Sequence, residues 1–179
     1  DGPAAAARYG PTVPRPSPLP LLCAAAAGSA AVLHAWLFSD GSLNNDEVAY
    51  LLQAQAVADG RLFLDAREPV EATRTWFFVE RPVGLVSKYL PLVSAVQALG
   101  LRLAGSVVPV LAVLAALVPL VVHRLAREVG LDPREALVAA GLVALSPVVV
   151  VQSALPLSYV LFLVLVTLGW LLVVRLGLR

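Results

Sequence analysis

The chain has 179 residues, of which 59% are hydrophobic and only 14% are charged. Soluble domains carry about a quarter charged residues, so this composition excludes an ordinary soluble domain and indicates an integral membrane protein. The formal net charge is +1, from 13 Lys and Arg against 12 Asp and Glu. This balance gives no overall basic field, so the sequence does not support a nucleic-acid partner.

A proline-rich segment opens the chain and an apolar run follows it. Residues 1–18 carry five prolines, a composition typical of an extended, disordered tail. Residues 19–39 are apolar over about the 20 residues that cross a bilayer as a helix. The run is longer than the apolar core of a signal peptide, so we predict an uncleaved first transmembrane helix. The single cysteine, Cys23, lies within it and cannot form an internal disulfide.

The segment that follows, residues 40–105, is too long for a plain connector and predicts structure of its own. Residues 47–58 favour a helix, with Asn45 or Asp46 as its N-cap and Gly60 after its end.

Residues 89–104 predict a second helix in this segment. It is apolar enough to suggest a further span, but Gln97 and Arg102 interrupt it. We therefore expect it to lie along the membrane interface.

Three later apolar runs, at 107–122, 136–151 and 159–174, predict that residues 106–179 hold transmembrane helices two to four. The expected fold is an all-α integral membrane protein with four transmembrane helices. Its long extracytoplasmic first loop carries two interfacial helices.

Basic residues predict the orientation, because cytoplasmic loops of membrane proteins are enriched in Lys and Arg. The tail, the 123–135 loop and the C-terminal end hold seven basic and four acidic residues, whereas the 40–105 loop holds six basic and eight acidic. We therefore expect a multi-pass protein of the bacterial cytoplasmic membrane, with both termini in the cytoplasm. The bacterial assignment rests on residue usage rich in Ala, Arg, Leu, Val, Gly and Pro.

Four stretches carry a resemblance to a known family. They are "NNDEVAYLLQAQAVADGRLFL", "WFFVERPVGLVSKYLPLVSAVQALG", "VHRLAREVGL" and "ALVAAGLVALSPVVVVQSALPLSYVLFLVLVTLGWLLVVR". In order and spacing the chain resembles the N-terminal part of the GT-C membrane glycosyltransferases. In particular, it resembles the bacterial enzymes of the dolichyl-phosphate-mannose mannosyltransferase and aminoarabinose transferase group, of glycosyltransferase family 39 type.

The resemblance implies a site on the outer face of the membrane. Asp46 and Glu47 would be the catalytic acidic pair, Lys88 and Arg81 would bind the donor phosphate, and the substrate would be lined by Tyr50 and Tyr89. The donor would be a polyprenyl-phosphate sugar; no other cofactor is implied, and the need for a divalent metal is left open. Where relatives commonly carry Lys-Tyr-Pro-Pro-Gly, this chain reads "KYLPL" at 88–92.

The chemistry of such a transfer fits these residue types. A carboxylate can take a proton from the acceptor hydroxyl, and a lysine can offset the charge of the leaving phosphate. Each residue also has a structural interpretation. Asp46 and Glu47 suit the first turn of a helix, Lys88 suits a membrane-interface anchor, and Tyr50, Trp76 and Tyr89 suit an aromatic belt.

Neither histidine predicts a metal centre. His34 lies alone in the first span and has no ligand-spaced partner, which favours helix packing or hydrogen bonding. His123 opens a basic loop and is expected to be solvated. The sequence contains no HExxH, paired CxxC, Walker or GxGxxG motif.

Two hypotheses remain for the function. The first is the N-terminal module of a lipid-linked sugar transferase, completed by further spans in a longer chain or in a partner. The second is a non-catalytic structural subunit of a larger energy-converting or photosynthetic membrane complex. Both imply membrane lipids and other membrane protein segments as partners; the acidic pair and Lys88 favour the first, and the short length favours the second.

Overall fold

The structure, a computed structural model, describes residues 17–41, 44–64, 77–82 and 84–177. The predicted proline-rich tail therefore lies outside the described residues up to position 16. The described part is mostly helical, as predicted. Its elements are α1 (Leu19–Leu37), α2 (Asn45–Ala58), β1 (Phe78–Arg81), β2 (Gly84–Ser87), α4 (Pro91–Ala104), α5 (Val108–Glu128), α6 (Pro133–Ala144), α7 (Pro147–Ser153) and α8 (Tyr159–Arg175).

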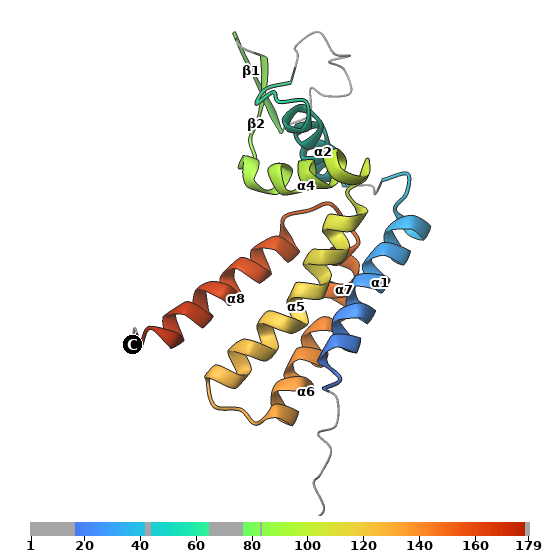
Figure 1. The fold of residues 1–179 in the computed structure, drawn as a ribbon. Helices are drawn as coiled ribbons and strands as arrows, with labels where there is room; N and C mark the ends of the chain where they lie inside the picture. The colour runs from blue at the N-terminus through green and yellow to red at the C-terminus, as the bar shows by residue number, and fades with distance from the viewer. Residues whose placement is uncertain (1–16, 42–43, 65–76, 83, 178–179) are drawn as a thin grey trace, which may run out of the picture.

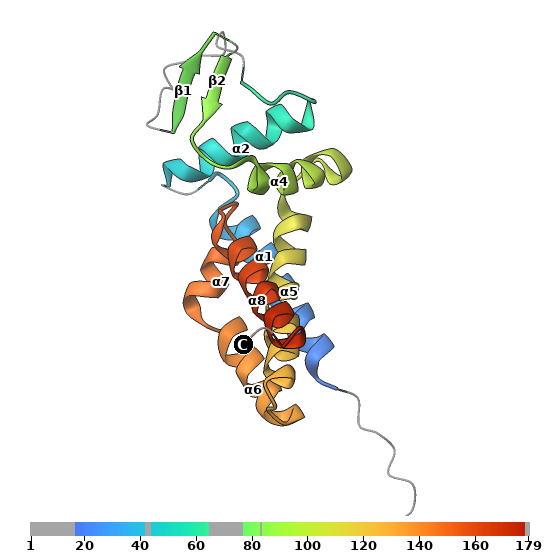
Figure 2. The same ribbon diagram turned by 90° about the vertical axis from the view of Figure 1, so that its left-hand side faces the viewer.

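These elements form two tiers (Figures 1 and 2). The helices α1, α5, α6, α7 and α8 make a bundle, which we call the lower tier. The upper tier consists of α2, the β1–β2 hairpin and α4, and α4 runs across the end of the bundle. The start of α1, the α5–α6 turn and the end of α8 all point away from the upper tier (Figure 1).

Helix α5 is the centre of the lower tier and packs against α1, α6 and α8. Val118 and Val121 of α5 are buried against Val160 and Val164 of α8. The outer surface of this bundle is apolar: Trp36 of α1 is 76% exposed and Phe162 of α8 is 67% exposed. Apolar side chains exposed in this number need a hydrocarbon environment, which supports an integral membrane protein.

Two described helices, α1 and α5, are long and apolar enough to cross a membrane, and α6 with α7 could supply a third span. The predicted first span agrees with α1. Helix α5 continues to Glu128, past position 122, where the predicted apolar run ends. Its last turns are made of the more polar residues that follow that run. Helix α8 has 17 residues, or about 26 Å, against a hydrocarbon core of about 30 Å.

The predicted span at 136–151 is not a straight helix. The chain forms α6 and α7 there, with a bend of 62° between them, and together they are apolar enough to be one broken span. Pro147 has no backbone N–H to continue the helix, and its ring disfavours helical geometry at the residue before it. Ser146 accordingly adopts an extended ψ of 129°, and Pro147 opens α7.

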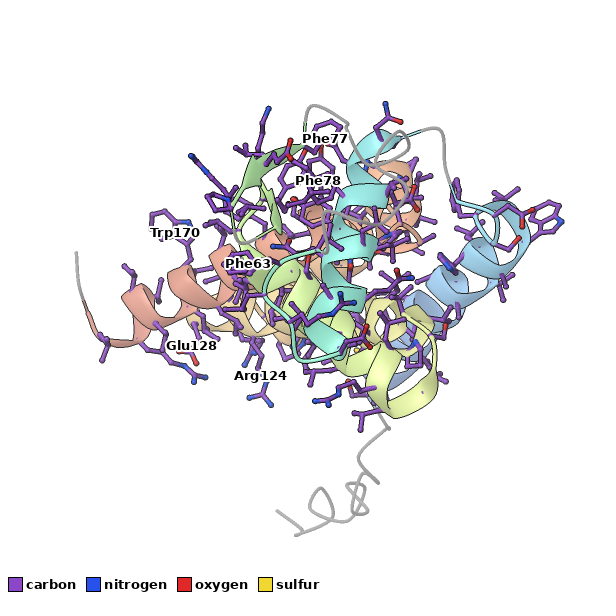
Figure 3. The ribbon with its side chains drawn as sticks, turned by 90° about the horizontal axis from the view of Figure 1, so that it is seen from above. Phe63, Phe77, Phe78, Arg124, Glu128 and Trp170 are labelled. Carbon is purple, nitrogen blue, oxygen red and sulfur yellow. The ribbon has the colours of Figure 1, made fainter. Side chains whose placement is uncertain are left out.

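Polar contacts fix the end of the lower tier that lies far from the upper tier. Arg175 of α8 donates to Glu128 of α5 at 2.6 and 2.8 Å. Figure 3 shows Glu128 beside the last turns of α8. Asp132 caps α6 in a capping box with Glu135. The backbone N–H groups of Glu135 and Arg134 donate to the Asp132 side chain, and these two hydrogen bonds lower the pKa of Asp132.

The upper tier contains a β-hairpin that the sequence analysis did not predict. β1 and β2 pair antiparallel, with Phe78 opposite Ser87 and Arg81 opposite Gly84. Leu64, beyond the end of α2, adds a bridge to Leu85 on the other edge of β2. Gly84 has a φ of +127°, and a Cβ there would collide with the Leu64 carbonyl oxygen, so this close approach requires glycine.

Helix α4 occupies the predicted 89–104 segment, starting two residues later because Pro91 takes the first helical position. It ends at Gly105 in the left-handed conformation, and α5 follows almost at once. Gly100 permits this sharp turn, since a Cβ there would come within 2.7 Å of the Ser106 carbonyl oxygen.

Candidate functional site

The first turn of α2 places the acidic pair. The side chain of Asn44 accepts a hydrogen bond from the Asp46 N–H at 3.0 Å, so Asn44 is the N-cap. The predicted caps, Asn45 and Asp46, were wrong by one and two positions. Both carboxylates now lie in the first turn, where the helix dipole favours negative charge.

The two carboxylates point in different directions, because neighbours on a helix are rotated by about 100°. Glu47 is only 2% exposed, so its side chain is buried in the upper tier. Asp46 is half-buried and lies one turn before Tyr50 on the same stripe of the helix. The structure therefore separates the pair: Glu47 is part of the interior of the upper tier, and Asp46 faces the aromatic residues.

Tyr89 connects Asp46 to the end of the hairpin. Its ring stacks on Tyr50, with centroids 4.5 Å apart, and on Phe77, with centroids 5.5 Å apart. Burial first, and then the hydrogen-bonding influence and the negative charge of Asp46, raise the pKa of Tyr89 to about 12, which keeps the phenol neutral. The Asp46 carboxylate therefore lies near the Tyr89 hydroxyl.

The hairpin also positions Lys88. The backbone N–H of Lys88 donates to the Phe77 carbonyl oxygen at 2.7 Å, which extends the ladder by one residue beyond β2. Figure 3 shows Phe77 and Phe78 side by side next to α2. The lysine side chain is exposed and borders a pocket that Tyr50 and Tyr89 also line.

This pocket, of about 370 Å³, lies between the two tiers, and we call it the junction pocket. One wall comes from the start of α4, with Leu92 and Val93. The opposite wall comes from α8, with Ser158 just before it and Phe162 and Leu165 on it. The junction pocket is therefore mainly apolar, with a cation and two phenol rings toward the upper tier, a composition suited to an amphiphile with an anionic head.

The predicted site residues fall into three groups. Lys88, Tyr89 and Tyr50 line the junction pocket. Asp46 does not line it but lies near Tyr89, which does. Arg81 is exposed at the far end of β1, opposite Gly84 and roughly 13 Å along the hairpin from the level of Lys88.

The histidines take structural positions. His34 Nδ1 lies 2.8 Å from the Ala154 carbonyl oxygen, so this nitrogen carries the proton and His34 joins α1 to the end of α7, the hydrogen-bonding role that the sequence favours. His123, which we expected to be solvated, is only half-exposed, and its Nδ1 is buried with no hydrogen-bond partner among the described residues. Within those residues, no cluster of three His, Cys, Asp or Glu could hold a metal ion.

Sequence reasoning missed the α8 wall. Ser158 and Phe162 follow Lys88 by about 70 positions, so no local spacing connects them. Only the sharp turn from α4 into α5 and the return through α6 and α7 bring α8 beneath Lys88.

Comparisons with protein families, with curated proteins and with solved structures found no match to this chain.

Proposed function

We propose that the chain is a GT-C-like glycosyltransferase module that handles a polyprenyl-phosphate sugar at the extracytoplasmic face of a membrane. One observation carries this proposal: Lys88 and Tyr89, which lies near Asp46, line a pocket whose walls are mainly apolar. A polyprenyl phosphate has a matching division, with an anionic head and a hydrocarbon chain.

Lys88 supplies the positive charge that the phosphate needs. A lysine ammonium is a compact point charge, and its electrostatic effect is strengthened beside an apolar wall. As the bond between the sugar and the phosphate breaks, charge grows on the phosphate oxygen, and Lys88 stabilises it.

Asp46 serves as the general base in this proposal. A carboxylate has about four lone-pair sites, so accepting the Tyr89 hydroxyl leaves capacity for a proton from an acceptor hydroxyl. Tyr89 holds the carboxylate in a fixed direction, and its stack on Tyr50 and Phe77 limits the motion of its own ring.

We further propose that α1, α5, the bent α6–α7 pair and α8 all enter the membrane, which gives the four predicted membrane segments. The upper tier then lies on the extracytoplasmic surface, and α4 lies in the interface. The excess of arginine at the far ends of α5 and α8 and at the start of α6 supports a cytoplasmic location for that side.

Binding of polyprenyl phosphate to the full chain in nanodiscs of neutral lipid tests this proposal. Native mass spectrometry measures the bound fraction for wild type, Lys88→Gln and the control Arg102→Gln. Arg102 is also exposed but lines a separate pocket beside the end of α2. We expect Lys88→Gln to weaken binding about tenfold and Arg102→Gln to leave it unchanged. Equal binding by wild type and Lys88→Gln contradicts the proposal.

A transfer assay separates binding from chemistry. In membranes supplied with a labelled polyprenyl-phosphate sugar, Asp46→Asn should abolish transfer while polyprenyl-phosphate binding persists. Unchanged transfer by Asp46→Asn removes this residue from the role of base.

A second candidate, a non-catalytic subunit of a larger membrane complex, is favoured by the use of the acidic pair in packing. Glu47 is almost fully buried, and Asp46 lies near Tyr89. Under this alternative the chain copurifies in fixed stoichiometry with other membrane proteins, and Lys88→Gln changes neither lipid binding nor assembly.

A further inference from the structure

A buried hydrogen bond joins the two walls of the junction pocket. The turn between α7 and α8, residues 154–157, is buried throughout. Gln97 of α4 is only 2% exposed, and its Nε2 donates to the Pro156 carbonyl oxygen of this turn at 2.7 Å. Gln97 thus links the helix that forms one wall to the turn that begins the other.

The placement of this bond relates it directly to the pocket. Gln97 follows Val93 by four residues, about one turn of α4, and Val93 is part of one wall. Pro156 precedes Ser158 by two residues, and Ser158 is part of the opposite wall. A change in the length or direction of this bond therefore moves the two walls relative to each other.

Apolar contacts at the same place cannot fix that geometry alone. Leu155 and Leu157 pack against Tyr50, and this burial pulls the tiers together without directional preference. A hydrogen bond requires both a distance and an angle. The Pro156 carbonyl oxygen is buried, so loss of the Gln97 donor leaves a buried acceptor without a hydrogen bond. This unfavourable state drives the chain to rearrange there.

We propose that Gln97 is a positioning residue that holds α4 and α8 at a fixed separation and so sets the width of the junction pocket. The occupant that this width serves is the polyprenyl chain of the proposed function. The geometric part of the inference does not depend on the identity of that occupant.

A distance measurement between spin labels tests the geometric part. In a Cys23→Ala background, labels are placed by cysteine substitution at Leu103 of α4 and Leu172 of α8, which are 85% and 59% exposed. We expect a narrow distance distribution in the otherwise unchanged chain and a broader one in Gln97→Leu. The matched control is Ser94→Ala. Ser94 is a buried residue of α4 that bonds Gln53 and the Tyr50 carbonyl of α2, so its loss should leave the α4–α8 distribution narrow.

The variant Gln97→Glu gives a test within a single folded protein. A protonated carboxyl group can donate to the Pro156 carbonyl as the amide does, but an ionised carboxylate cannot. The distribution should therefore be narrow at low pH and broaden as pH rises through the pKa of the introduced carboxyl group, which burial raises. The wild-type distribution should not change over this range. A pH-independent distribution in Gln97→Glu, or a narrow one in Gln97→Leu, overturns the inference.

Binding of polyprenyl phosphate then separates this inference from the proposed function. We expect Gln97→Leu to bind about fivefold more weakly than wild type, as the loss of one buried hydrogen bond implies. Equal binding overturns the role of Gln97 in setting the pocket. No binding by wild type contradicts the proposed function, and the distance distributions still decide whether Gln97 positions α4 and α8.

Discussion

The link between Tyr89 and Asp46 leads to a prediction about the ionisation of the phenol. Burial is the largest cause that raises the pKa of Tyr89 to about 12, and the hydrogen bond to Asp46 is the second. Asp46→Asn removes the negative charge, so we expect the pKa of Tyr89 to fall but to stay above 10, because the burial remains.

The same shift makes folding stability depend on pH. Tyr89 is harder to ionise in the folded chain than in the unfolded chain, so its contribution is fully present below pH 10 and is lost as pH rises toward 12. A rise from 10 to about 12 corresponds to about 2.7 kcal/mol, and screening by the solvent that reaches part of the ring reduces this to about 1 kcal/mol.

The assay is an absorbance titration near 295 nm of the full chain in nanodiscs. The chain has four tyrosines, so the difference between wild type and Tyr89→Phe isolates the step that belongs to Tyr89. The same difference in the Asp46→Asn background gives the pKa without the carboxylate. An identical Tyr89 pKa in both backgrounds refutes the proximity of Asp46 to the Tyr89 hydroxyl.

Three further predictions concern the scaffold. Gly84→Ala forces a side chain against the Leu64 carbonyl oxygen at a φ of +127°. Exchange of the Leu64 and Leu85 amide hydrogens should therefore accelerate about tenfold or more. Unchanged exchange contradicts this close approach. Pro147→Ala removes the cause of the break between α6 and α7, so the 62° bend should decrease in label-to-label distances; an unchanged bend means that tertiary contacts hold it. The depressed pKa of Asp132 means that its cap stabilises α6 above pH 3.8 and is lost as pH falls through the lower folded-state pKa. Amide protection at Ala136 should therefore decrease in acid, and Asp132→Ala should remove that pH dependence.

The sequence predicted the helices whose signals are local. Apolar length defined α1, and a run of helix-forming residues before Gly60 defined α2. The N-cap was misplaced because Asn44, Asn45 and Asp46 are all good caps, and only the backbone direction decides which oxygen reaches the helix. The break at Pro147 was visible in the sequence, but average hydropathy stays high across it and hides it.

The candidate site depended on contacts that the sequence does not encode locally. The order of residues predicted that Asp46 and Lys88 share one side of the membrane, but not that Tyr89 joins them. The sequence analysis interpreted Gln97 as an interruption in an apolar helix. In the structure its amide donates to the Pro156 carbonyl oxygen in the turn before α8. Arg81 looked close to Lys88 in sequence, yet seven residues of hairpin carry it to the opposite end of the ladder.

Photocrosslinking is the most direct test of polyprenyl-phosphate binding in the junction pocket, because it identifies the residues that contact the bound lipid. A polyprenyl phosphate with a diazirine in its first isoprene units is bound to the full chain in nanodiscs, irradiated and mapped by mass spectrometry. We expect labels on the two walls of the junction pocket, at residues 90–93 and 158–165, and markedly weaker labelling there in Lys88→Gln. Labels spread evenly around the bundle, or concentrated on α1, contradict it.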